Sequence, residues 1–467
     1  MMLGRTRRIH FVGIGGIGMS GIAELLANQG YAVSGSDAKA SDVTRRLETL
    51  GVRVLTGHAA EHVGDADVVV VSSAVKPTNP EVVAARARAI PVIPRAEMLA
   101  ELMRLKQGIA VGGAHGKTTT TSMVALLLDR AGLDPTAVIG GRLSAFGSNA
   151  RLGQGSYLVA EADESDGSFL FLSPVISIVT NVDREHLDHY GSFEGVLDAF
   201  VAFANKVPFW GVVIACADDA QLMALRPRIT RRVVTYGIES ATSDVKASAV
   251  TLEAFGSTCR VAAGGRELGT MRLSVPGRHN LLNALSAVAV GLELGLRFEA
   301  IAAALVEFRG AERRFQPLGE AAGVLVVDDY GHHPTEITAV VAAARAGLER
   351  RLVVVFQPHR YSRTERLLPE FGAALATADV VVLCDIYPAG EDPIPGVTVE
   401  AIAAAVQAAG GPAPVIVRAI DDVPAGVAAL VRAGDLVITL GAGSIGAVGP
   451  KVLAAIAAGG ADSGEAR

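Results

Sequence analysis

A glycine-rich segment with a single lysine has the residue types needed to bind a nucleoside triphosphate. Residues 112–121 read GGAHGKTTTT and stand between a β-branched run and a helical stretch. In such a loop, backbone N–H groups and the Lys117 ammonium surround phosphate oxygens, and the Thr118 hydroxyl can reach Mg²⁺. Val111 stands where the usual motif has its first glycine, so the loop is one residue shorter. The residues expected to bind ATP here are Gly113, Ala114, His115, Gly116, Lys117, Thr118 and Thr119.

A second glycine cluster near the N-terminus follows the pattern G-x-G-x-x-G. Its members are Gly13, Gly15, Gly16, Ile17 and Gly18, and Asp37 follows about 20 residues later, where a ribose-binding acid is expected. Between a strand and a helix, this pattern predicts a site for the diphosphate of a dinucleotide or sugar nucleotide. By itself it favours a nicotinamide-dependent enzyme. A glycine-rich packing turn is the simpler alternative.

Acidic and histidine side chains follow two predicted strands of the same region. Four acids, Glu161, Asp163, Glu164 and Asp166, come after the strand at 157–160 and are candidate Mg²⁺ ligands beside a triphosphate site. The segment 181–190 ends the next strand and contains His186, Asp188 and His189. These three residues could form a zinc site, but phosphoryl transfer explains more of their neighbours.

Two polar segments end strands in the last third of the chain. One, at 328–334, reads DDYGHHP, and the other, at 357–363, reads QPHRYSR. Arg360 and Arg363 lie three positions apart, so on one helical turn they would share a face. Paired arginines suit bidentate recognition of a carboxylate, although a pair on the surface with no ligand would look the same.

The elements that must position these residues alternate between strands and helices. This alternation predicts an α/β protein with parallel sheets. The expected strands are 9–12, 32–35, 68–72, 109–111, 157–160, 175–180, 212–215, 324–328, 352–356, 380–384 and 436–440. The expected helices are 19–29, 117–131, 280–294, 299–308 and 336–346, and the small, polar tail from Gly459 is expected to be disordered.

Composition excludes several classes of protein. The chain has 467 residues, enough for about three domains. Half of the residues are hydrophobic, which is too many for a disordered chain, and no apolar run reaches the roughly 18 residues of a membrane span. A net charge of −6 argues against a nucleic-acid partner bound through bulk positive charge. Three widely spaced cysteines fit a reducing compartment.

The N-terminal arginines raise the alternative of a secretory signal. Arg5, Arg7 and Arg8 precede an apolar stretch, as in a signal peptide. Glycines interrupt that stretch, and a phosphate-binding loop explains them where a signal peptide does not. The expected location is therefore the cytoplasm.

Taken together, the motifs resemble the Mur ligases, the ATP-dependent amino-acid-adding enzymes of peptidoglycan synthesis. The matching segments are collinear over nearly the whole chain: GIGGIGMSGIA (13–23), GGAHGKTTTT (112–121), EADESDGSF (161–169), HLD within 181–190, GRHNLLNALSA (277–287), RRF (313–315), DDYGHHPTEI (328–337), FQPHRYSRT (356–364) and YPAGE (387–391). Two of these, 328–337 and 356–364, look specific to the branch that adds alanine to UDP-N-acetylmuramate. The short phosphate loop is also the form found in this family.

The resemblance implies three α/β domains with separate tasks. A Rossmann-like domain at 1–107 would bind the UDP-sugar, a P-loop-type ATPase domain at 108–308 would bind ATP, and a Rossmann-like domain at 309–467 would bring the amino acid. Lys117, Glu161, His186 and His332 would be catalytic, and Thr118, Glu161 and His186 would hold Mg²⁺. Further ATP contacts would come from His279, Asn280, Asn283, Arg314 and Asp329, and the amino acid would contact Tyr330, His332, Arg360 and Arg363.

The resemblance also carries an expected difference and a close alternative. Sister enzymes carry a modified lysine about 14 residues after the HLD histidine, but this chain has Phe200 there, so no carbamylated lysine is expected. A related peptide-recycling ligase uses the same sugar nucleotide with a peptide in place of alanine. A nicotinamide-dependent oxidoreductase and a non-catalytic nucleotide switch are more distant alternatives. The expected partners are small molecules only, without membrane insertion, and the chain is expected to be a monomer or weak homodimer.

Overall fold

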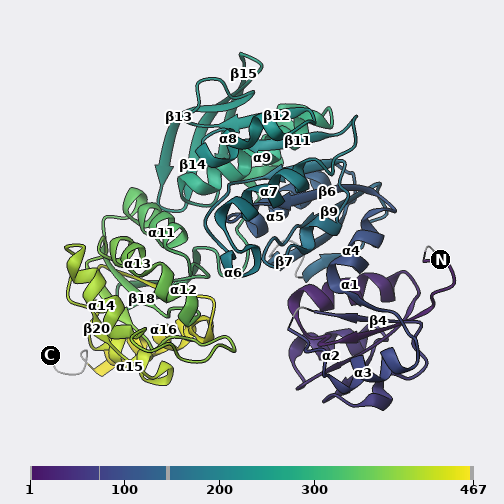
Figure 1. The fold of residues 1–467 in the computed structure, drawn as a ribbon. Coiled ribbons are helices and arrows are strands. Elements are labelled where there is room, and N and C mark those ends of the chain that lie inside the picture. The colour runs from purple at the N-terminus through teal and green to yellow at the C-terminus, as the bar shows by residue number, and fades with distance from the viewer. Residues whose placement is uncertain (1–2, 73, 144–147, 463–467) are drawn as a thin grey trace. The chain divides into compact units, whose positions relative to one another are not determined.

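The computed structural model describes residues 3–72, 74–143 and 148–462. Three β-sheets with their helices follow one another along the chain (Figure 1). By their internal contacts the residues form two compact units. The first comprises Met1–Ala249, Cys259–Arg272 and Leu282–Arg309, and the second comprises Val250–Thr258, Leu273–Leu281 and Gly310–Arg467. The predicted α/β class with mostly parallel sheets is confirmed.

The first sheet has five strands in the order β3-β2-β1-β4-β5, and all its neighbouring strands are parallel. The inner strand β4 consists of four valines and is mostly buried. Such apolar strands are typical of a parallel sheet, because helices cover both of its faces. Its strands are β1 (Arg8–Val12), β2 (Ala32–Asp37), β3 (Arg53–Thr56), β4 (Val68–Val71) and β5 (Val92–Pro94). Its helices are α1 (Ile17–Asn28), α2 (Asp42–Thr49), α3 (Pro80–Ala87) and α4 (Arg95–Met103), with a 3₁₀ turn η1 (Ala60–Val63).

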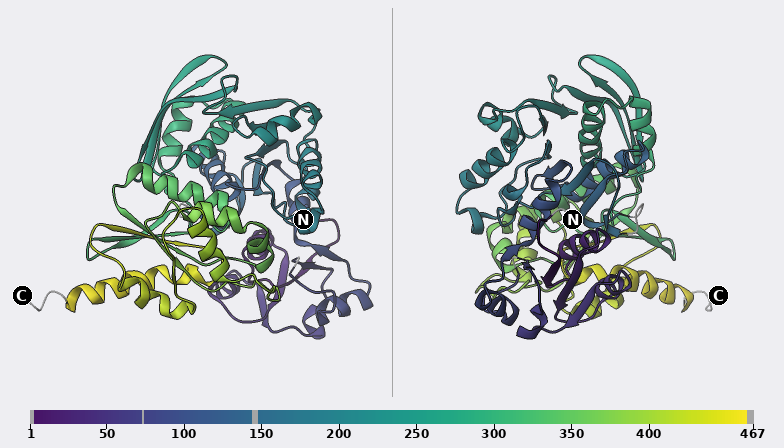
Figure 2. Two further views of the ribbon diagram at one scale, coloured as in Figure 1. Left: turned by 60° about the vertical axis from the view of Figure 1, so that its left-hand side comes forward. Right: turned by 90° about the vertical axis from the view of Figure 1, so that its right-hand side faces the viewer.

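The second sheet has ten strands in the order β15-β14-β13-β12-β11-β10-β6-β9-β7-β8. Strands β6, β9, β10 and β11 are parallel to their neighbours and carry the motifs of this region. Strands β13 to β15 form the other end of the sheet, a long ribbon that Figure 2 shows from two sides. The strands are β6 (Gln107–Gly112), β7 (Thr136–Leu143), β8 (Ser148–Arg151), β9 (Tyr157–Glu161), β10 (Ile176–Val179), β11 (Val212–Cys216), β12 (Val233–Gly237), β13 (Val245–Glu253), β14 (Gly256–Ala263) and β15 (Arg266–Leu273).

The helices of this region include the one that follows the phosphate loop. They are α5 (Lys117–Arg130), α6 (Leu187–Tyr190), α7 (Phe193–Ala204), α8 (Ala220–Leu225), α9 (Arg278–Glu293) and α10 (Phe298–Val306), with 3₁₀ turns η2 (Ser168–Phe171) and η3 (Arg226–Arg228). Almost every residue of α5 is buried, so this helix lies in the interior of its layer. The loop before it is therefore held by a rigid element.

The third sheet has six strands in the order β16-β17-β21-β18-β19-β20. Only β16 is antiparallel to its neighbour. The strands are β16 (Gln316–Ala321), β17 (Val324–Asp329), β18 (Arg351–Phe356), β19 (Val380–Leu383), β20 (Val415–Ile416) and β21 (Asp435–Leu440). The helices are α11 (Pro334–Gly347), α12 (Tyr361–Arg366), α13 (Leu368–Leu375), α14 (Val399–Ala408), α15 (Val423–Ala428) and α16 (Gly449–Asp462), with turns η4 (Ile420–Asp422) and η5 (Ser444–Ala447).

Every strand and helix expected from the sequence is present, with ends that differ by at most two residues. The tail is the exception. Disorder was expected from Gly459, but α16 continues to Asp462, because the preceding turns bury Val452 and Ile456 against the third sheet and support the helix. The last five residues lie outside the described part of the chain.

Candidate active site

The loop before α5 needs glycine for two different geometric reasons. Gly113 has φ +134° and Gly116 has φ +80°, both in the region that favours glycine. A side chain at Gly113 would also collide with the Thr180 hydroxyl, because a Cβ there would lie 2.0 Å from Oγ1. A Cβ on Gly116 would lie 2.6 Å from Oδ1 of Asn283. The loop therefore packs closely against the end of β10 and against α9, and only glycine fits at these two positions.

Hydrogen bonds from the end of β10 hold the loop in place. The Thr180 hydroxyl and the Asn181 amide both donate to the carbonyl of His115, at 2.6 and 3.0 Å. The His115 N–H in turn donates to Asn181 Oδ1 at 2.8 Å, and the His115 ring lies 2.9 Å from an Asp183 oxygen. The predicted loop and the polar residues after β10 are thus one assembly.

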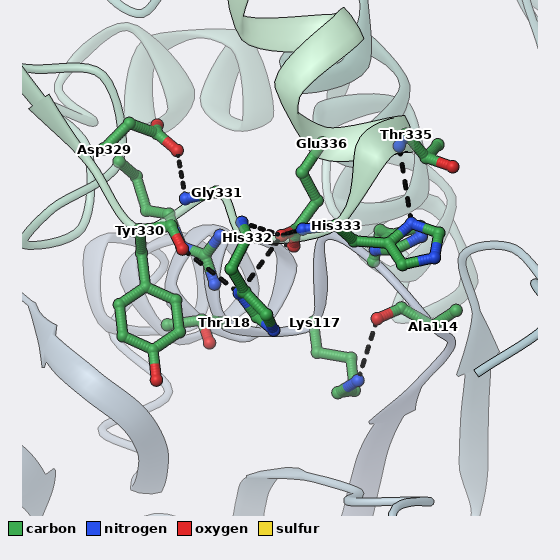
Figure 3. Close-up of polar contacts among 12 residues, drawn as sticks. Ala114, Lys117, Thr118, Asp329, Tyr330, Gly331, His332, His333, Thr335 and Glu336 are labelled. Carbon is green, nitrogen blue, oxygen red and sulfur yellow. Dashed lines mark hydrogen bonds and ion pairs between the residues drawn. The ribbon is translucent and has the colours of Figure 1, made fainter. Parts of the chain in front are cut away.

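The Lys117 ammonium lies on the inside of this loop. It donates to the carbonyls of Gly113 and Ala114, at 2.7 and 3.1 Å, and to Glu164 Oε1 at 2.7 Å; Figure 3 shows its bond to Ala114. Burial lowers the pKa of Lys117, but the charges of Glu164, Asp163 and Glu161 outweigh it, so the pKa is raised overall. Lys117 is therefore a permanent cation at the start of a buried helix.

The Thr118 hydroxyl and the Glu161 carboxylate meet beside the lysine. Thr118 Oγ1 donates to Glu161 Oε2 at 2.9 Å, and the Gly140 N–H donates to the same oxygen at 2.9 Å. Glu161 ends β9 and Thr118 starts α5, so two neighbouring elements supply the pair. A hydroxyl and a carboxylate are oxygen ligands of the kind that Mg²⁺ prefers. The predicted metal ligands Thr118 and Glu161 therefore fit such an ion.

His186 is held in an unusual backbone conformation, with φ +56°. Its Nε2 lies 3.5 Å from a Glu185 oxygen and 3.8 Å from Glu164 Oε1. Within the described residues, the side chains whose potential ligand atoms lie within 4.8 Å of His186 and of one another are Glu164 and Glu185, not Asp188 and His189. No such group among the described residues joins His186 with Asp188 and His189, so the alternative zinc site is not formed.

The glycine loop after β1 is held by hydrogen bonds to the end of β2. The N–H groups of Gly13 and Ile14 both donate to the carbonyl of Ser36, at 2.8 and 2.9 Å. Asp37 Oδ2 accepts the Gly15 N–H at 2.9 Å, so this carboxylate holds the loop. A Cβ on Gly15 would lie 2.8 Å from Asp37 Oδ2, and one on Gly18 would lie 2.7 Å from Arg95 Nη1. Two of these glycines thus make room for side chains of the protein itself.

A cavity of about 290 Å³ lies over this loop within the first unit. It is lined by the loop, by Arg95 and Ser72, and by Gly140, Glu161 and Asp163. Arg95 Nη2 lies 3.7 Å from an Asp163 oxygen. The predicted UDP-sugar residues Gly13, Gly16 and Gly18 therefore share a cavity with the predicted metal ligand Glu161. The Ile17 side chain lies outside the described residues, although α1 begins there.

Sequence reasoning missed Arg95, and it missed a buried network beneath the loop. Glu81 is fully buried and accepts hydrogen bonds from the Ser36 hydroxyl at 2.8 Å and from His58 at 2.7 Å. Its other oxygen lies 2.6 Å from Nε2 of His10, which is also fully buried. No motif marks these residues. The signal available was Glu81, the one acid in the helical stretch Pro80–Ala87.

In the second unit, Asp329 organises the loop that follows β17. Its two oxygens accept the N–H groups of Phe315 and Gly331, at 2.7 and 2.6 Å. Burial raises the pKa of Asp329 to about 6, against the opposing effects of Arg314 and these hydrogen bonds. Burial and the charge of Arg314 lower the pKa of His279 to about 4, so His279 is a neutral ring at pH 7. Asn280 donates to the carbonyl of Pro276 at 2.7 Å.

The paired histidines after β17 form the start of α11. Glu336 Oε2 accepts the N–H groups of His332 and His333, at 3.0 and 3.3 Å, and the His333 ring accepts the Thr335 N–H (Figure 3). This is a capping arrangement at a helix start. His332 packs edge-on against Tyr330, with ring centres 5.4 Å apart. The predicted residues Tyr330 and His332 are thus held together.

The two arginines of the 357–363 segment do not share a helical face as expected. Arg360 precedes α12 with φ +74°, so only Arg363 lies on the helix. Glu391 causes this turn, because its carboxylate accepts both the N–H and the hydroxyl of Ser362, at 3.0 and 2.7 Å, and lies 4.0 Å from Arg360. Arg363 lies 3.4 Å from both the ring and the carbonyl of His359.

His359 connects the arginines to the predicted amino-acid site. Its ring stacks on Tyr387, with centres 5.5 Å apart, and lies edge-on to His332 at 5.7 Å. Burial lowers its pKa to about 3, helped by His332 and the two arginines. A neutral His359 adds no positive charge beside the arginine pair.

These features define a class of protein: a multidomain nucleotide-binding α/β enzyme with carboxylates beside a phosphate-binding loop. Comparison with known families then gives the particular one. The family model described as "Mur ligase family, catalytic domain" matches residues 8–107, the Mur ligase middle domain matches 111–291, and the model described as "Mur ligase, glutamate ligase domain" matches 313–443. The chain belongs to the Mur ligase family.

Individual relatives agree with this assignment. The chain is 56% identical over 453 residues to a UDP-N-acetylmuramate–L-alanine ligase of Geobacter sp. (strain M21), covering 97% of this chain and 98% of the relative. It is similar to the crystal structure of a UDP-N-acetylmuramate–alanine ligase from Thermotoga maritima, with 31% identity, a TM-score of 0.81, and 96% and 98% of the two chains covered. A murein peptide ligase from Psychrobacter arcticus matches with 26% identity, a TM-score of 0.72, and 97% and 99% covered.

Within the residues that the structure describes, no helix has both the length and the apolar character needed to cross a bilayer.

Proposed function

We propose that this chain is an ATP-dependent ligase that joins L-alanine to the carboxylate of UDP-N-acetylmuramate, releasing ADP and phosphate. One observation carries the proposal: 56% identity over nearly the full length to a UDP-N-acetylmuramate–L-alanine ligase, in a chain whose predicted ligase residues occupy strand ends. The nicotinamide-dependent alternative is not favoured, since it leaves Lys117 and Glu161 without a role. The reaction belongs to the synthesis of cell-wall peptidoglycan.

The chemistry explains why ATP is needed. A carboxylate does not react with an amine directly, because oxide is a very poor leaving group. If a carboxylate oxygen attacks the γ-phosphorus, the bond from that phosphorus to the bridging oxygen breaks, and ADP leaves. The acyl phosphate then reacts with the alanine amine: a C–N bond forms, the C–O bond to phosphate breaks, and the amine releases its proton. The first step brings two anions together and therefore needs fixed cations.

The loop before α5 supplies such a cation for ATP. Lys117 is permanently charged and lies among the loop carbonyls. We infer that ATP phosphates displace the Glu164 carboxylate from Lys117 and occupy the N–H groups of the loop. Gly113 to Thr119 would then surround the phosphates, while Asn283, His279 and Asn280 are assigned to the nucleotide by resemblance. Arg314 and Asp329 are assigned to it in the same way.

Mg²⁺ is expected to bind with ATP. Thr118 and Glu161 offer one ion a hydroxyl and a carboxylate 2.9 Å apart, and His186 offers an imidazole nitrogen to a second ion. When bound, Mg²⁺ neutralises charge on the phosphate oxygens as a Lewis acid. Lys117 contributes its own fixed positive charge whether or not the ion is present.

The cavity over the N-terminal glycine loop supports the position of the sugar nucleotide. Its lining includes Gly13, Gly16 and Gly18 together with Glu161. A diphosphate held by the loop and the start of α1 would direct the sugar along the cavity towards Glu161. Asp37 would contribute indirectly, by holding Gly15 in position.

The third sheet would bring alanine. Arg360 and Arg363 would bind its carboxylate, while Tyr330 and His332 would lie beside its amine. His332 is a candidate proton acceptor, because its ring is held against Tyr330 and Glu336. Domain closure on ligand binding is expected, since the reaction needs residues from all three domains.

The acceptor experiment tests the function directly. Purified chain with UDP-N-acetylmuramate, Mg²⁺ and ATP should release phosphate when free L-alanine is added. Release that requires a murein tripeptide, and not alanine, would identify the peptide-recycling ligase instead. If neither alanine nor the tripeptide causes phosphate release, both assignments are contradicted. Mass spectrometry of the product, expected to be UDP-N-acetylmuramoyl-alanine, provides the confirmation.

Replacing Arg363 with alanine should raise the KM for L-alanine by about 10- to 100-fold, since a charge-assisted hydrogen bond contributes about 1.5–3 kcal/mol. The KM for ATP should change less than about twofold. Initial-rate kinetics with each substrate varied in turn measure both values. Arg366→Ala on the same helix, at an exposed position, is the matched control. Equal increases in both KM values would exclude the proposed contact with the carboxylate.

We expect the chain to act in the cytoplasm, where UDP-sugars and ATP are available. We expect it to be a monomer or a weak homodimer.

A further inference from the structure

The cavity over the N-terminal glycine loop lies where the first sheet reverses its strand order. In the order β3-β2-β1-β4-β5, strands β2 and β3 lie on one side of β1, and β4 and β5 lie on the other. Ligands of open parallel sheets bind at such a point, outside the carboxyl ends of the strands. The glycine loop follows β1, Ser72 follows β4, and Arg95 follows β5 as the first residue of α4. All three line the cavity, so Arg95 lies where a ligand is expected.

The glycine loop by itself has few donors left for a diphosphate. The backbone N–H groups of residues 13–16 all donate within the protein. Those of Gly13 and Ile14 donate to the Ser36 carbonyl, the next donates to Asp37 Oδ2, and the last donates to the Gly13 carbonyl at 3.2 Å. A diphosphate at this loop therefore needs hydrogen-bond donors from another element.

The charges of the cavity lining point to the same need. Glu161 and Asp163 are both in the lining, and Arg95 is the one cation among the described residues that line it. The diphosphate of a sugar nucleotide is an anion, and like charges next to each other in a binding site are unfavourable. Arg95 is therefore the side chain of this lining that can offset the charge of an entering diphosphate.

The guanidinium of Arg95 has donors available for a ligand. A guanidinium carries several N–H donors in a fixed, planar arrangement. Nη2 of Arg95 lies 3.7 Å from an Asp163 oxygen, which makes an ion pair but is too long for a hydrogen bond. The side chain is 24% exposed, so it remains accessible. Asp163 thus orients Arg95 without occupying its donors.

Arg95 also lies directly beside the glycine loop. Buried Met98, Leu99 and Leu102 fix α4 in its layer, so a rigid helix presents the guanidinium. A Cβ on Gly18 would lie 2.7 Å from Nη1 of Arg95 and 3.1 Å from its Cζ. Gly18 has no positive φ, so glycine at this position leaves space for the guanidinium rather than allowing a special backbone conformation. The last glycine of the motif and Arg95 are thus neighbours at the cavity.

We infer that Arg95 binds the diphosphate of the sugar nucleotide, which replaces Asp163 as the partner of the guanidinium. A planar guanidinium can donate two parallel hydrogen bonds to phosphate oxygens. Arg95 supplies in this way the donors that the glycine loop has engaged within the protein. The inference deepens the proposed function and rests on it, because it assigns a charged residue to the expected UDP-sugar.

Binding of two sugar nucleotides to the full-length chain tests this assignment. Titration calorimetry without alanine measures the affinity for UDP-N-acetylmuramate and for UDP-N-acetylglucosamine, which has the same diphosphate but no carboxylate. Arg95→Gln should weaken both by about 10- to 100-fold and by the same factor, because charge-assisted hydrogen bonds to phosphate are lost. Arg95→Lys should weaken both less, since it keeps the charge but not the planar pair of donors. The affinity for ATP should change less than about twofold.

Arg104→Gln, at the other end of α4, is the matched control, because its side chain is 62% exposed and lies outside the cavity lining. Thermal unfolding shows whether each variant is folded. If Arg95→Gln does not fold, Arg95→Lys decides the question, and unchanged affinity in that variant would overturn the inference.

Three further results would overturn it: unchanged affinity of folded Arg95→Gln for both sugar nucleotides, a loss confined to UDP-N-acetylmuramate, which would place Arg95 at the carboxylate, or an equal loss of affinity for ATP. The two levels of the argument fail separately. If the unaltered chain does not bind UDP-N-acetylmuramate, the proposed function fails as well. If it binds this nucleotide as tightly with Arg95→Gln as without it, only the inference about Arg95 fails.

Discussion

Replacing Lys117 with alanine should lower the kcat of alanine-dependent phosphate release by about a thousandfold or more. Lys117 is a partly buried, permanent cation held by the loop carbonyls and by Glu164. Phosphoryl transfer depends on such fixed charge, and losing a comparable cation costs other phosphoryl-transfer enzymes about 10³–10⁵ in rate. Binding of the UDP-sugar should persist, because the N-terminal glycine loop is a different element.

Two measurements characterise this variant, and two further variants serve as comparisons. Phosphate release gives the rate, and calorimetry with UDP-N-acetylmuramate shows whether the sugar nucleotide still binds. The exposed Lys206→Ala is the matched control. Because Lys117→Ala leaves Glu164 without its cation, the double variant Lys117→Ala/Glu164→Gln should recover stability but not activity. Turnover close to that of the unaltered chain would show that the loop does not bind triphosphate.

Replacing Glu81 with glutamine should reduce the free energy of unfolding by about 3 kcal/mol at pH 7. Glu81 and His10 are both fully buried, and Ser36 and His58 complete the network. Breaking a buried ionic network by removing one charge typically costs about 3–5 kcal/mol, and glutamine retains part of the hydrogen bonding. Because the Ser36 carbonyl holds Gly13 and Ile14, affinity for the UDP-sugar should fall as well.

The pH dependence of this effect follows from the pKa of Glu81. Burial raises that pKa, but hydrogen bonds from His10, Ser36 and His58 outweigh burial and lower it below the usual 4.5. The ionised form is thus favoured in the folded state. Its contribution to stability is present above about pH 4.5 and is lost as pH falls further. Urea unfolding at pH 7 and pH 4 should show the difference between the two chains shrinking, with the exposed Glu61→Gln as control. A difference independent of pH would contradict the ionised network.

The local signals that were easiest to interpret concern strands and helices with strong patterns. The runs that became β4, β18 and β21 are β-branched and buried on both faces, so their type follows from composition. The helix after the phosphate loop was expected at 117–131 and occurs at Lys117–Arg130. The strands that sequence reasoning did not predict, such as β13 to β16 and β20, are partly exposed or very short.

Contacts between distant segments were harder to foresee. Asp37 was expected to bind a ribose, and the sequence did not indicate that its carboxylate also accepts the Gly15 N–H. Arg95 lies 77 positions after Gly18 in the chain, yet it explains why that position has no side chain. Arg360 lies outside the expected helix, because Glu391 from a later loop caps the segment at Ser362.

The sequence by itself determined the α/β class, the glycine loops and the family, because these depend on residue types at short, fixed spacing. A phosphate loop needs neighbouring glycines, a lysine and a helix start, and all of them lie within ten residues. Only the tertiary structure decided which carboxylate meets which cation. Glu164 meets both Lys117 and His186, and Glu81 meets His10, across 22 to 71 positions of the chain. Such pairings depend on how strands and helices pack side by side, and no local pattern encodes that packing.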